Sequence, residues 1–145
     1  MGELSDEDYF FREKIRNLLE KMERDCDAFV VEGKNDEIAL KALGVSKRIF
    51  KVSKREISEF CDTVSHCSDN VVILVDFDKA GKEINKELLE NLKGDVNVLS
   101  SYRKQFGILL TSRDRFCIED INPLLNKGFD KFDEVKLSRL YSNLG

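Results

Sequence analysis

Three acidic residues that follow two short apolar runs are the residues of this chain best suited to chemistry. The first run, residues 28–31, leads into Glu32. The second, residues 71–75, leads into Asp76 and Asp78. Three carboxylates brought to one place repel one another unless a cation neutralises them. Carboxylate oxygens suit hard divalent ions, so the pattern predicts a Mg²⁺ or Mn²⁺ site formed by these three acids.

The two apolar runs also predict the elements that position these acids. Both runs are short, uninterrupted and rich in β-branched residues, which is typical of strands buried on both faces of a parallel sheet. Open α/β sheets bind their ligands at the carboxyl ends of such strands. We therefore expect the three carboxylates to converge at that edge of the sheet.

Strand and helix patterns alternate along the chain. Further strands are expected at residues 48–52 and 96–99. Ser53 to Glu56 has the pattern of a capping box that opens a helix, and Asn35 is expected to cap an earlier one. The pattern weakens after residue 100, where a helix over 102–110, a short strand at 116–118 and a terminal helix from Phe129 are expected. Alternation of this kind predicts an α/β fold, with a mostly parallel four-stranded sheet between helices and extra N- and C-terminal helices.

The distribution of charge bears on the choice of partner. The net charge is −4, and residues 1–27 account for all of it. Basic residues outnumber acidic ones between residues 32 and 55, and a second basic group follows. The first group includes Lys34, Lys51, Lys54 and Arg55, and the second includes Arg103 and Lys104. Basic residues beside a metal-binding edge suit a phosphate backbone, although lysines and arginines at this density also simply solvate helices.

Several classes of protein are disfavoured. No apolar run approaches the roughly 20 residues of a membrane span, and the acidic start is unlike a signal peptide, so we expect a cytoplasmic protein with no membrane partner. The four cysteines form no CxxC pair, which argues against structural zinc. Gly33-Lys34 lacks the preceding glycine of a phosphate-binding loop, and no GxGxxG follows a strand.

The two acidic motifs resemble those of the toprim domain, which is shared by bacterial-type primases, topoisomerases, overcoming-lysogenization-defect nucleases and the maturase of 5S ribosomal RNA. The family pattern is one strand that ends in Glu-Gly and a later strand that ends in Asp-x-Asp. Residues 30–36 and 73–82 match both halves. Topoisomerases usually carry a third acid where this chain has Ala80, so the chain is most similar to the small stand-alone, primase-like toprim proteins of archaea and to the rRNA maturase.

The resemblance implies a toprim, Rossmann-like fold and a role for each motif. We expect an N-terminal helix over residues 1–26, the toprim domain over 27–128 and a helical tail over 129–145. Glu32 would be the general acid or base, and Asp76 and Asp78 would hold Mg²⁺ or Mn²⁺. Residues expected to contact phosphate are Gly33, Lys34, Lys51, Lys54, Arg55, Lys79, Gly81 and Lys82, although the lysines could equally be solvated. Asp36, Glu119 and Asp120 are additional candidate acids, with a helix-capping role as the alternative for Asp120.

Three hypotheses about function follow from this resemblance. The first is a Mg²⁺-dependent enzyme that cuts a phosphodiester backbone, an endonuclease or RNA-processing nuclease acting on RNA or DNA. The second is a non-catalytic toprim module that binds nucleic acid or a ribonucleoprotein. A primase-like nucleotidyltransferase is a third and weaker hypothesis. Replacing Glu32 with Gln discriminates the first two, because a nuclease loses turnover whereas a binding module is hardly affected.

Overall fold

Four parallel strands form a single sheet in the computed structural model, which describes residues 6–114. The strands are β1 (Ala28–Val31), β2 (Arg48–Lys51), β3 (Asn70–Ile73) and β4 (Asn97–Val98), in the order β2-β1-β3-β4. The helices of this part of the chain are α1 (Asp6–Asp25), α2 (Lys34–Ala42), α3 (Ile57–Cys67), α4 (Lys79–Leu92) and α5 (Ser100–Thr111). The predicted α/β fold with a parallel four-stranded sheet is confirmed.

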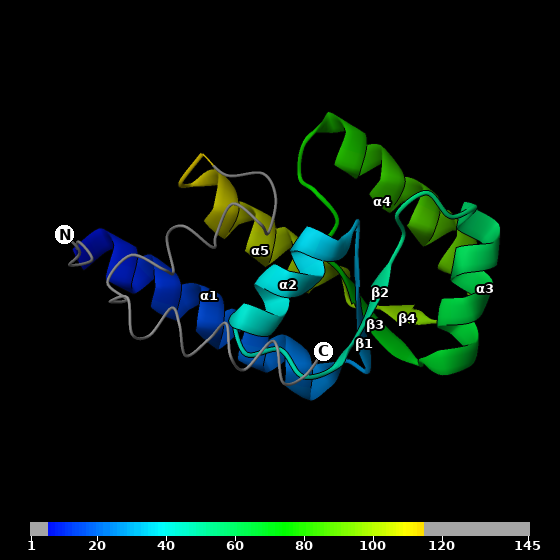
Figure 1. Ribbon diagram of the computed structural model, residues 1–145, viewed down its shortest axis with the longest axis horizontal. Helices are drawn as coiled ribbons and strands as arrows, with labels where there is room; N and C mark the ends of the chain where they lie inside the picture. The colour runs from blue at the N-terminus through cyan, green and yellow to red at the C-terminus, as the bar shows by residue number, and fades with distance from the viewer. Residues whose placement is uncertain (1–5, 115–145) are drawn as a thin grey trace.

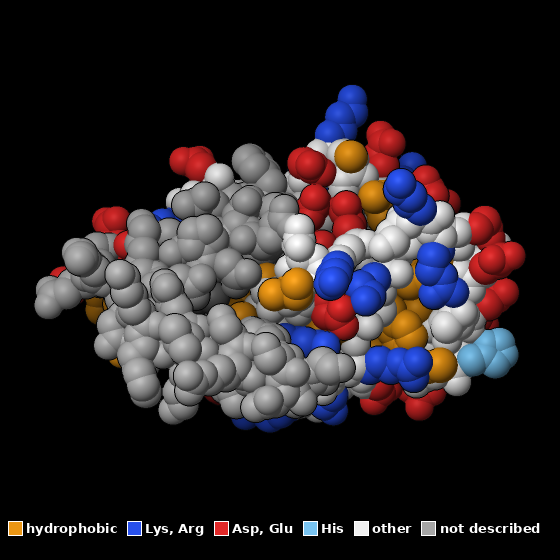
Figure 2. Space-filling view, viewed as in Figure 1, with side chains coloured by type: hydrophobic (Ala, Val, Ile, Leu, Met, Phe, Trp, Pro, Cys, Tyr) orange, Lys and Arg blue, Asp and Glu red, His pale blue; other side chains and the backbone are white. Residues whose placement is uncertain are grey.

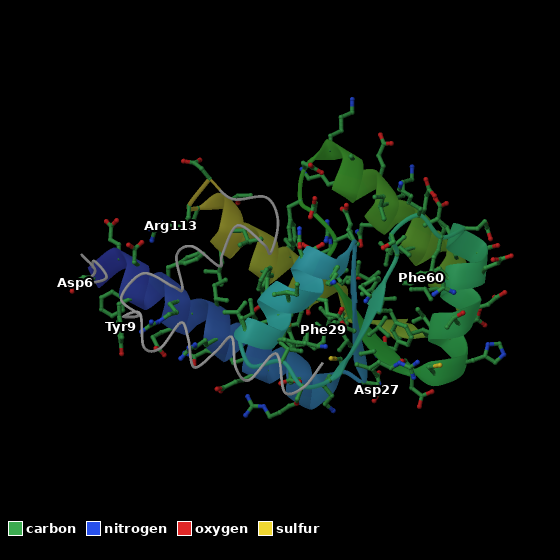
Figure 3. The ribbon with its side chains drawn as sticks, in the orientation of Figure 1. Asp6, Tyr9, Asp27, Phe29, Phe60 and Arg113 are labelled. Carbon is green, nitrogen blue, oxygen red and sulfur yellow. The ribbon has the colours of Figure 1, made fainter. Side chains whose placement is uncertain are left out.

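The helices lie on both faces of the sheet (Figure 1). Side chains of α1, α2 and α5 form one core with one face of the strands, and side chains of α3 and α4 form a second core with the other face. Phe29 of β1 belongs to the first core, and Phe60 of α3 belongs to the second (Figure 3). Burying both faces explains why β1 and β3 read as continuous apolar runs rather than as alternating ones.

Strand β1 shows how the sequence fills both cores. Its four residues are all buried, and successive side chains point to opposite faces. Phe29 and Val31 pack with α1, α2 and α5, whereas Ala28 and Val30 pack with α3 and α4. Glu32 is the first residue after this strand, so the sheet fixes where its backbone lies.

Helix α1 corresponds to the predicted N-terminal helix, and its apolar face packs into the first core. Its buried stripe includes Phe11, Ile15 and Met22. Two polar contacts connect α1 with α5 and with the turn that follows α5. The Tyr102 hydroxyl donates a hydrogen bond to Asp25, and Arg113 forms an ion pair with Asp8. The domain boundaries at residues 26 and 128 stay predictions.

Two expected helix starts are wrong. Ser53 does not cap α3, because its N–H donates to the Glu32 carbonyl 2.7 Å away and so keeps it paired with the sheet, at a φ of +46°. Helix α3 begins later, where the Glu56 side chain accepts hydrogen bonds from the N–H groups of Ser58 and Glu59. Gly33, rather than Asn35, is the N-cap residue of α2.

Several expectations lie outside the described residues. These are the strand at 116–118, the terminal helix over 129–145, and the candidate acids Glu119 and Asp120. Within residues 6–114, no helix is both long enough and apolar enough to cross a membrane.

Gly81 allows α4 to start directly against the backbone of Asp76. A Cβ atom at position 81 would lie 2.0 Å from the Asp76 carbonyl oxygen, whereas one at Gly33 would meet nothing within 4 Å. Gly81→Ala should therefore lower the free energy of unfolding by about 1–3 kcal/mol through overpacking. Gly33→Ala, the control, creates no close contact and should cost less, about 0.5–1 kcal/mol, because Ala is a poorer helix cap than Gly. Urea denaturation measures both values, and equal effects would contradict the proposed close approach.

Asp27 links the starts of β1 and β3 at the amino edge of the sheet. Its exposed carboxylate accepts a hydrogen bond from the Asn70 N–H at 2.8 Å and another from the Asp69 N–H at 2.9 Å. These two bonds hold the pKa of Asp27 below its usual value. The stabilisation is therefore complete above the unfolded pKa of about 3.9 and is lost as the pH falls through the folded pKa.

Asp27→Ala should accordingly destabilise the protein at neutral pH, and the difference from the wild type should shrink below about pH 4. Thermal unfolding at about pH 7 and about pH 3 measures this difference. Asp62→Ala, at an exposed acid of α3, is the control. If the difference in stability between Asp27→Ala and the wild type is the same at both pH values, the ionised carboxylate of Asp27 is not the source of the stabilisation.

Candidate functional site

The carboxyl ends of β1 and β3 lie side by side at the point where the connections diverge. Helix α2 follows β1 and packs on one face of the sheet, whereas α4 follows β3 and packs on the other. Such a switch point leaves a crevice in which α/β proteins bind ligands. Here it holds a cleft of about 650 Å³, whose lining includes Glu32, Lys34, Asp36, Lys54 and Asp76.

Glu32 and Asp76 are brought together in this cleft, as the sequence predicts. The Asp76 N–H donates a hydrogen bond to Glu32 Oε1 at 3.0 Å, and both side chains are half-buried. The bond fixes one oxygen of the Glu32 carboxylate and leaves Oε2 as the oxygen available for another ligand or a proton. Figure 2 shows acidic side chains gathered between the first turns of α2 and α4.

Asp78 does not form a three-carboxylate metal group with Glu32 and Asp76 within residues 6–114, and its role as a metal ligand stays a prediction. It is the N-cap residue of α4, and its Oδ1 accepts a hydrogen bond from the Gly81 N–H at 2.8 Å. Within residues 6–114, no group of three or more acidic, histidine or cysteine side chains is placed to hold a metal ion. The unpaired N–H groups at a helix start compete with a metal for this carboxylate.

Asp36 has a structural partner in the same cleft. Its side chain is only 6% exposed, and its Oδ2 accepts a hydrogen bond from the Gly33 N–H at 3.1 Å. This bond closes the first turn of α2 in the manner of a capping box. The structure therefore gives Asp36 a capping contact.

Arg103 is a site residue to which the sequence assigned no role beyond a basic group. Its guanidinium donates to the carbonyl oxygens of Val75 at 2.6 Å and of Asp76 at 3.0 Å. It also lies 4.2 Å from the centre of the Phe77 ring. The sequence did contain a signal for this role. Arg103 lies three residues before Phe106, so a charged side chain falls on the face of α5 that is otherwise apolar and buried.

The charge of Arg103 faces the acidic pair from inside the fold. Burial lowers the pKa of Arg103 to about 10, while the nearby Asp76 and Glu32 carboxylates act in the opposite direction. The side chain is 9% exposed and still positively charged at neutral pH. It therefore offsets part of the repulsion between the two acids.

Only two of the basic residues predicted to contact phosphate line the cleft, and the others lie elsewhere. Lys34 and Lys54 line the cleft. Lys51 is paired with Glu37 at 2.9 Å and holds the pKa of that carboxyl below its usual value. Arg55 stacks over Phe60 and donates to Thr63, so it belongs to the packing of α3. Lys79 is exposed in the first turn of α4, and Lys82 lines a separate groove.

Comparisons with known proteins agree with this geometry. Residues 27–109 match the Toprim domain family. The UPF0292 protein of Archaeoglobus fulgidus is 42% identical over 105 residues, which is 70% of this chain and 80% of that protein. The UPF0292 protein of Thermococcus onnurineus is 35% identical over 115 residues, which is 79% of this chain and 85% of that protein.

A solved structure also matches. The structure of a protein from Aquifex aeolicus superposes with a TM-score of 0.62 at 26% identity, over 75% of this chain and 96% of that one. The family match covers the strands β1 to β4 and both acidic motifs. The chain therefore belongs to the toprim-domain family and is a relative of the small stand-alone UPF0292 toprim proteins of archaea.

Proposed function

We propose that this protein is a Mg²⁺-dependent nuclease that cleaves a phosphodiester bond of RNA or DNA in the cleft between β1 and β3. The observation that carries the proposal is the pair of carboxylates, Glu32 and Asp76, at the switch point of the sheet, with Lys34 and Lys54 in the same cleft. The toprim family supports a fold that binds metal and acts on nucleic acid.

The donor set fits a divalent ion of the hard class. Mg²⁺ in nucleic-acid enzymes is commonly held by one or two carboxylates, with water and substrate phosphate as the other ligands. The Asp76 carboxylate and one oxygen of Asp78 would be those protein ligands, which leaves Glu32 Oε2 for proton transfer. Asp78 keeps one oxygen on the Gly81 N–H, so only its other oxygen is open to the ion. When bound, the ion would neutralise charge on the phosphate and orient the attacking group.

The side chains around the cleft supply the remaining steps. Lys34 and Lys54 bind phosphate oxygens and hold the backbone across the cleft. The Asp76 N–H fixes the orientation of Glu32, so that Oε2 is the atom that takes or returns a proton. Arg103 holds the Asp76 peptide in place through its hydrogen bonds to the carbonyl oxygens of Val75 and Asp76.

A specific observation favours a second candidate, a non-catalytic module that binds nucleic acid through the same cleft. Residues 6–114 contain no group of three metal-binding side chains. A module of this kind would retain Lys34 and Lys54 for binding and would use Glu32 only to fix the Asp76 backbone. Loss or retention of cleavage on changing Glu32 separates the two candidates.

Glu32→Gln should abolish cleavage and leave binding nearly unchanged, because the amide oxygen can still accept from Asp76 but cannot exchange a proton. The expected loss is about 100-fold or more, the usual contribution of a general acid or base. Labelled total RNA and plasmid DNA, incubated with Mg²⁺, Mn²⁺ or a chelator, measure the activity. Glu90→Gln, at an exposed acid of α4, is the control. Cleavage that survives in Glu32→Gln or in chelator would overturn the nuclease proposal.

Lys34→Glu combined with Lys54→Glu should weaken binding to nucleic acid and flatten its dependence on salt. Each phosphate contact contributes a slope of about −0.7 to −0.9 in the logarithm of affinity against the logarithm of salt concentration. The double variant should therefore lose up to two such units. Fluorescence anisotropy over a range of salt concentrations measures the slope.

The matched control carries the same change of charge on α1, as Lys14→Glu with Lys21→Glu. Both residues are exposed, and neither lines the cleft. We expect this pair to retain the wild-type slope. Equal losses in both double variants would mean that bulk charge, rather than the cleft, determines binding.

A further inference from the structure

A second concave surface lies beside the cleft, between α4 and α5. Helix α4 belongs to one layer and α5 to the other, and the edge strand β4 between them has only two residues. The result is a groove of about 440 Å³, which we name the α4–α5 groove; its lining includes Phe77, Lys82, Asn85, Lys104 and Ile108. Asp76 lines the cleft and Phe77 lines the groove, so the two surfaces meet at consecutive residues.

The floor of this groove includes the edge of a fixed aromatic ring, Phe77, which is only 8% exposed. Phe77 is held by the Arg103 guanidinium 4.2 Å from its centre and packs against Phe106. The backbone of α5 approaches the ring so closely that a Cβ atom on Gly107 would lie 2.8 Å from it. Ile108, which is 61% exposed, and the half-buried Leu89 form apolar walls. A flat apolar ligand would fit between these side chains.

Polar groups accompany the apolar ones. Lys82 and Lys104 are exposed and place two cations on the groove, one from each helix. The Oδ1 atom of Asn85 is buried and has no hydrogen-bond partner within residues 6–114. A buried acceptor without a partner is uncommon and calls for an explanation. An N–H donor on a ligand seated in the groove would supply the missing partner after a small rotation of the amide.

We infer that the α4–α5 groove binds one unstacked nucleotide of a single strand whose backbone crosses the Glu32–Asp76 cleft. A nucleobase has a flat apolar face, which matches the apolar walls formed by Ile108 and Leu89, and amino groups at its edge, which match Asn85. Its phosphates match Lys82 and Lys104. A purely apolar partner would leave both lysines unused, and a free phosphate would leave the apolar walls unused. The inference rests on the proposed function only in taking nucleic acid as the ligand.

The groove therefore restricts the class of substrate. A base in a duplex is paired and stacked, so reaching the floor of the groove would require its extrusion. Bases of single strands, loops and ends are free to stack on protein side chains. We expect single-stranded nucleic acid, or an unpaired segment next to the cleavage site, to bind more tightly than a matched duplex.

The test measures binding in chelator, where no cleavage occurs. Fluorescence anisotropy compares a labelled single strand with a series of strands that each lack one base. For the wild type, one abasic position should weaken binding about tenfold, because a base stacked on side chains contributes at that level. In Ile108→Asp, the same abasic position should have no further effect. Ile108→Ala is a milder second variant that should reduce the abasic penalty.

Two sets of controls are available in the chain. Phe10 on α1 is 61% exposed, the same fraction as Ile108, so Phe10→Asp makes the same chemical change away from the groove. Lys82→Glu with Lys104→Glu is matched by Lys86→Glu with Lys93→Glu, both exposed at or near α4. Only the groove variants should weaken binding beyond what the change in net charge explains.

The outcomes separate this inference from the proposed nuclease. An abasic penalty that disappears in Ile108→Asp supports the groove even if the wild type cleaves nothing. Equal binding of duplex and single strand, with no penalty at any abasic position, would overturn it even if Glu32-dependent cleavage is observed. Competition by a free nucleoside monophosphate as strong as that by the strand would also overturn it, because the ligand would then be a small molecule.

Discussion

Both polar groups of the Asp76 backbone are bound by side chains from other elements, and the geometry of the site depends on this residue. Its N–H donates to Glu32 after β1, and its carbonyl accepts from Arg103 on α5. Its carbonyl oxygen also lies against Gly81 at the start of α4. Elements that are far apart in the chain therefore meet at one residue, and the Glu32 carboxylate cannot turn without breaking its bond to the Asp76 N–H. Hydrogen bonds to the Asp76 backbone therefore hold this part of the cleft in place.

The buried Arg103 side chain also explains how the Glu32 and Asp76 carboxylates can lie close together. Glu32 and Asp76 share a half-buried cleft, where mutual repulsion is stronger than in water. Arg103 provides a positive charge on the protein side of the pair and is hydrogen-bonded to two carbonyl oxygens, which satisfies its buried donors. The acidic side of the cleft is therefore less negative than a count of its carboxylates suggests. A single divalent ion, together with Lys34 and Lys54 in the lining of the same cleft, would be enough to balance a phosphate.

The sequence predicted the strands and the meeting of Glu32 with Asp76, because a run of buried β-branched residues locates a strand and its end without knowledge of the partners. It did not predict the cap formed by Asp78, since an acid between a strand and a helix suits a metal and a helix start equally well. Arg103 was missed because its partners are backbone carbonyls, which no side-chain motif records. Ser53 was misassigned because a pairing with Glu32, distant in sequence, outweighed a local capping preference.

The parallel arrangement of the sheet has a consequence for how the protein folds. No two of its strands are joined by a tight hairpin, and β1 pairs with both β2 and β3. The pairing of β1 with β3 aligns Val30 with Ile73, so a long stretch of chain must be closed into a loop before the two strands gain any contact. The cleft forms only when that loop has closed. A nascent chain that has produced α1, β1, α2 and β2 would expose the unpaired edge of β1, which makes this strand the point most open to wrong association during synthesis.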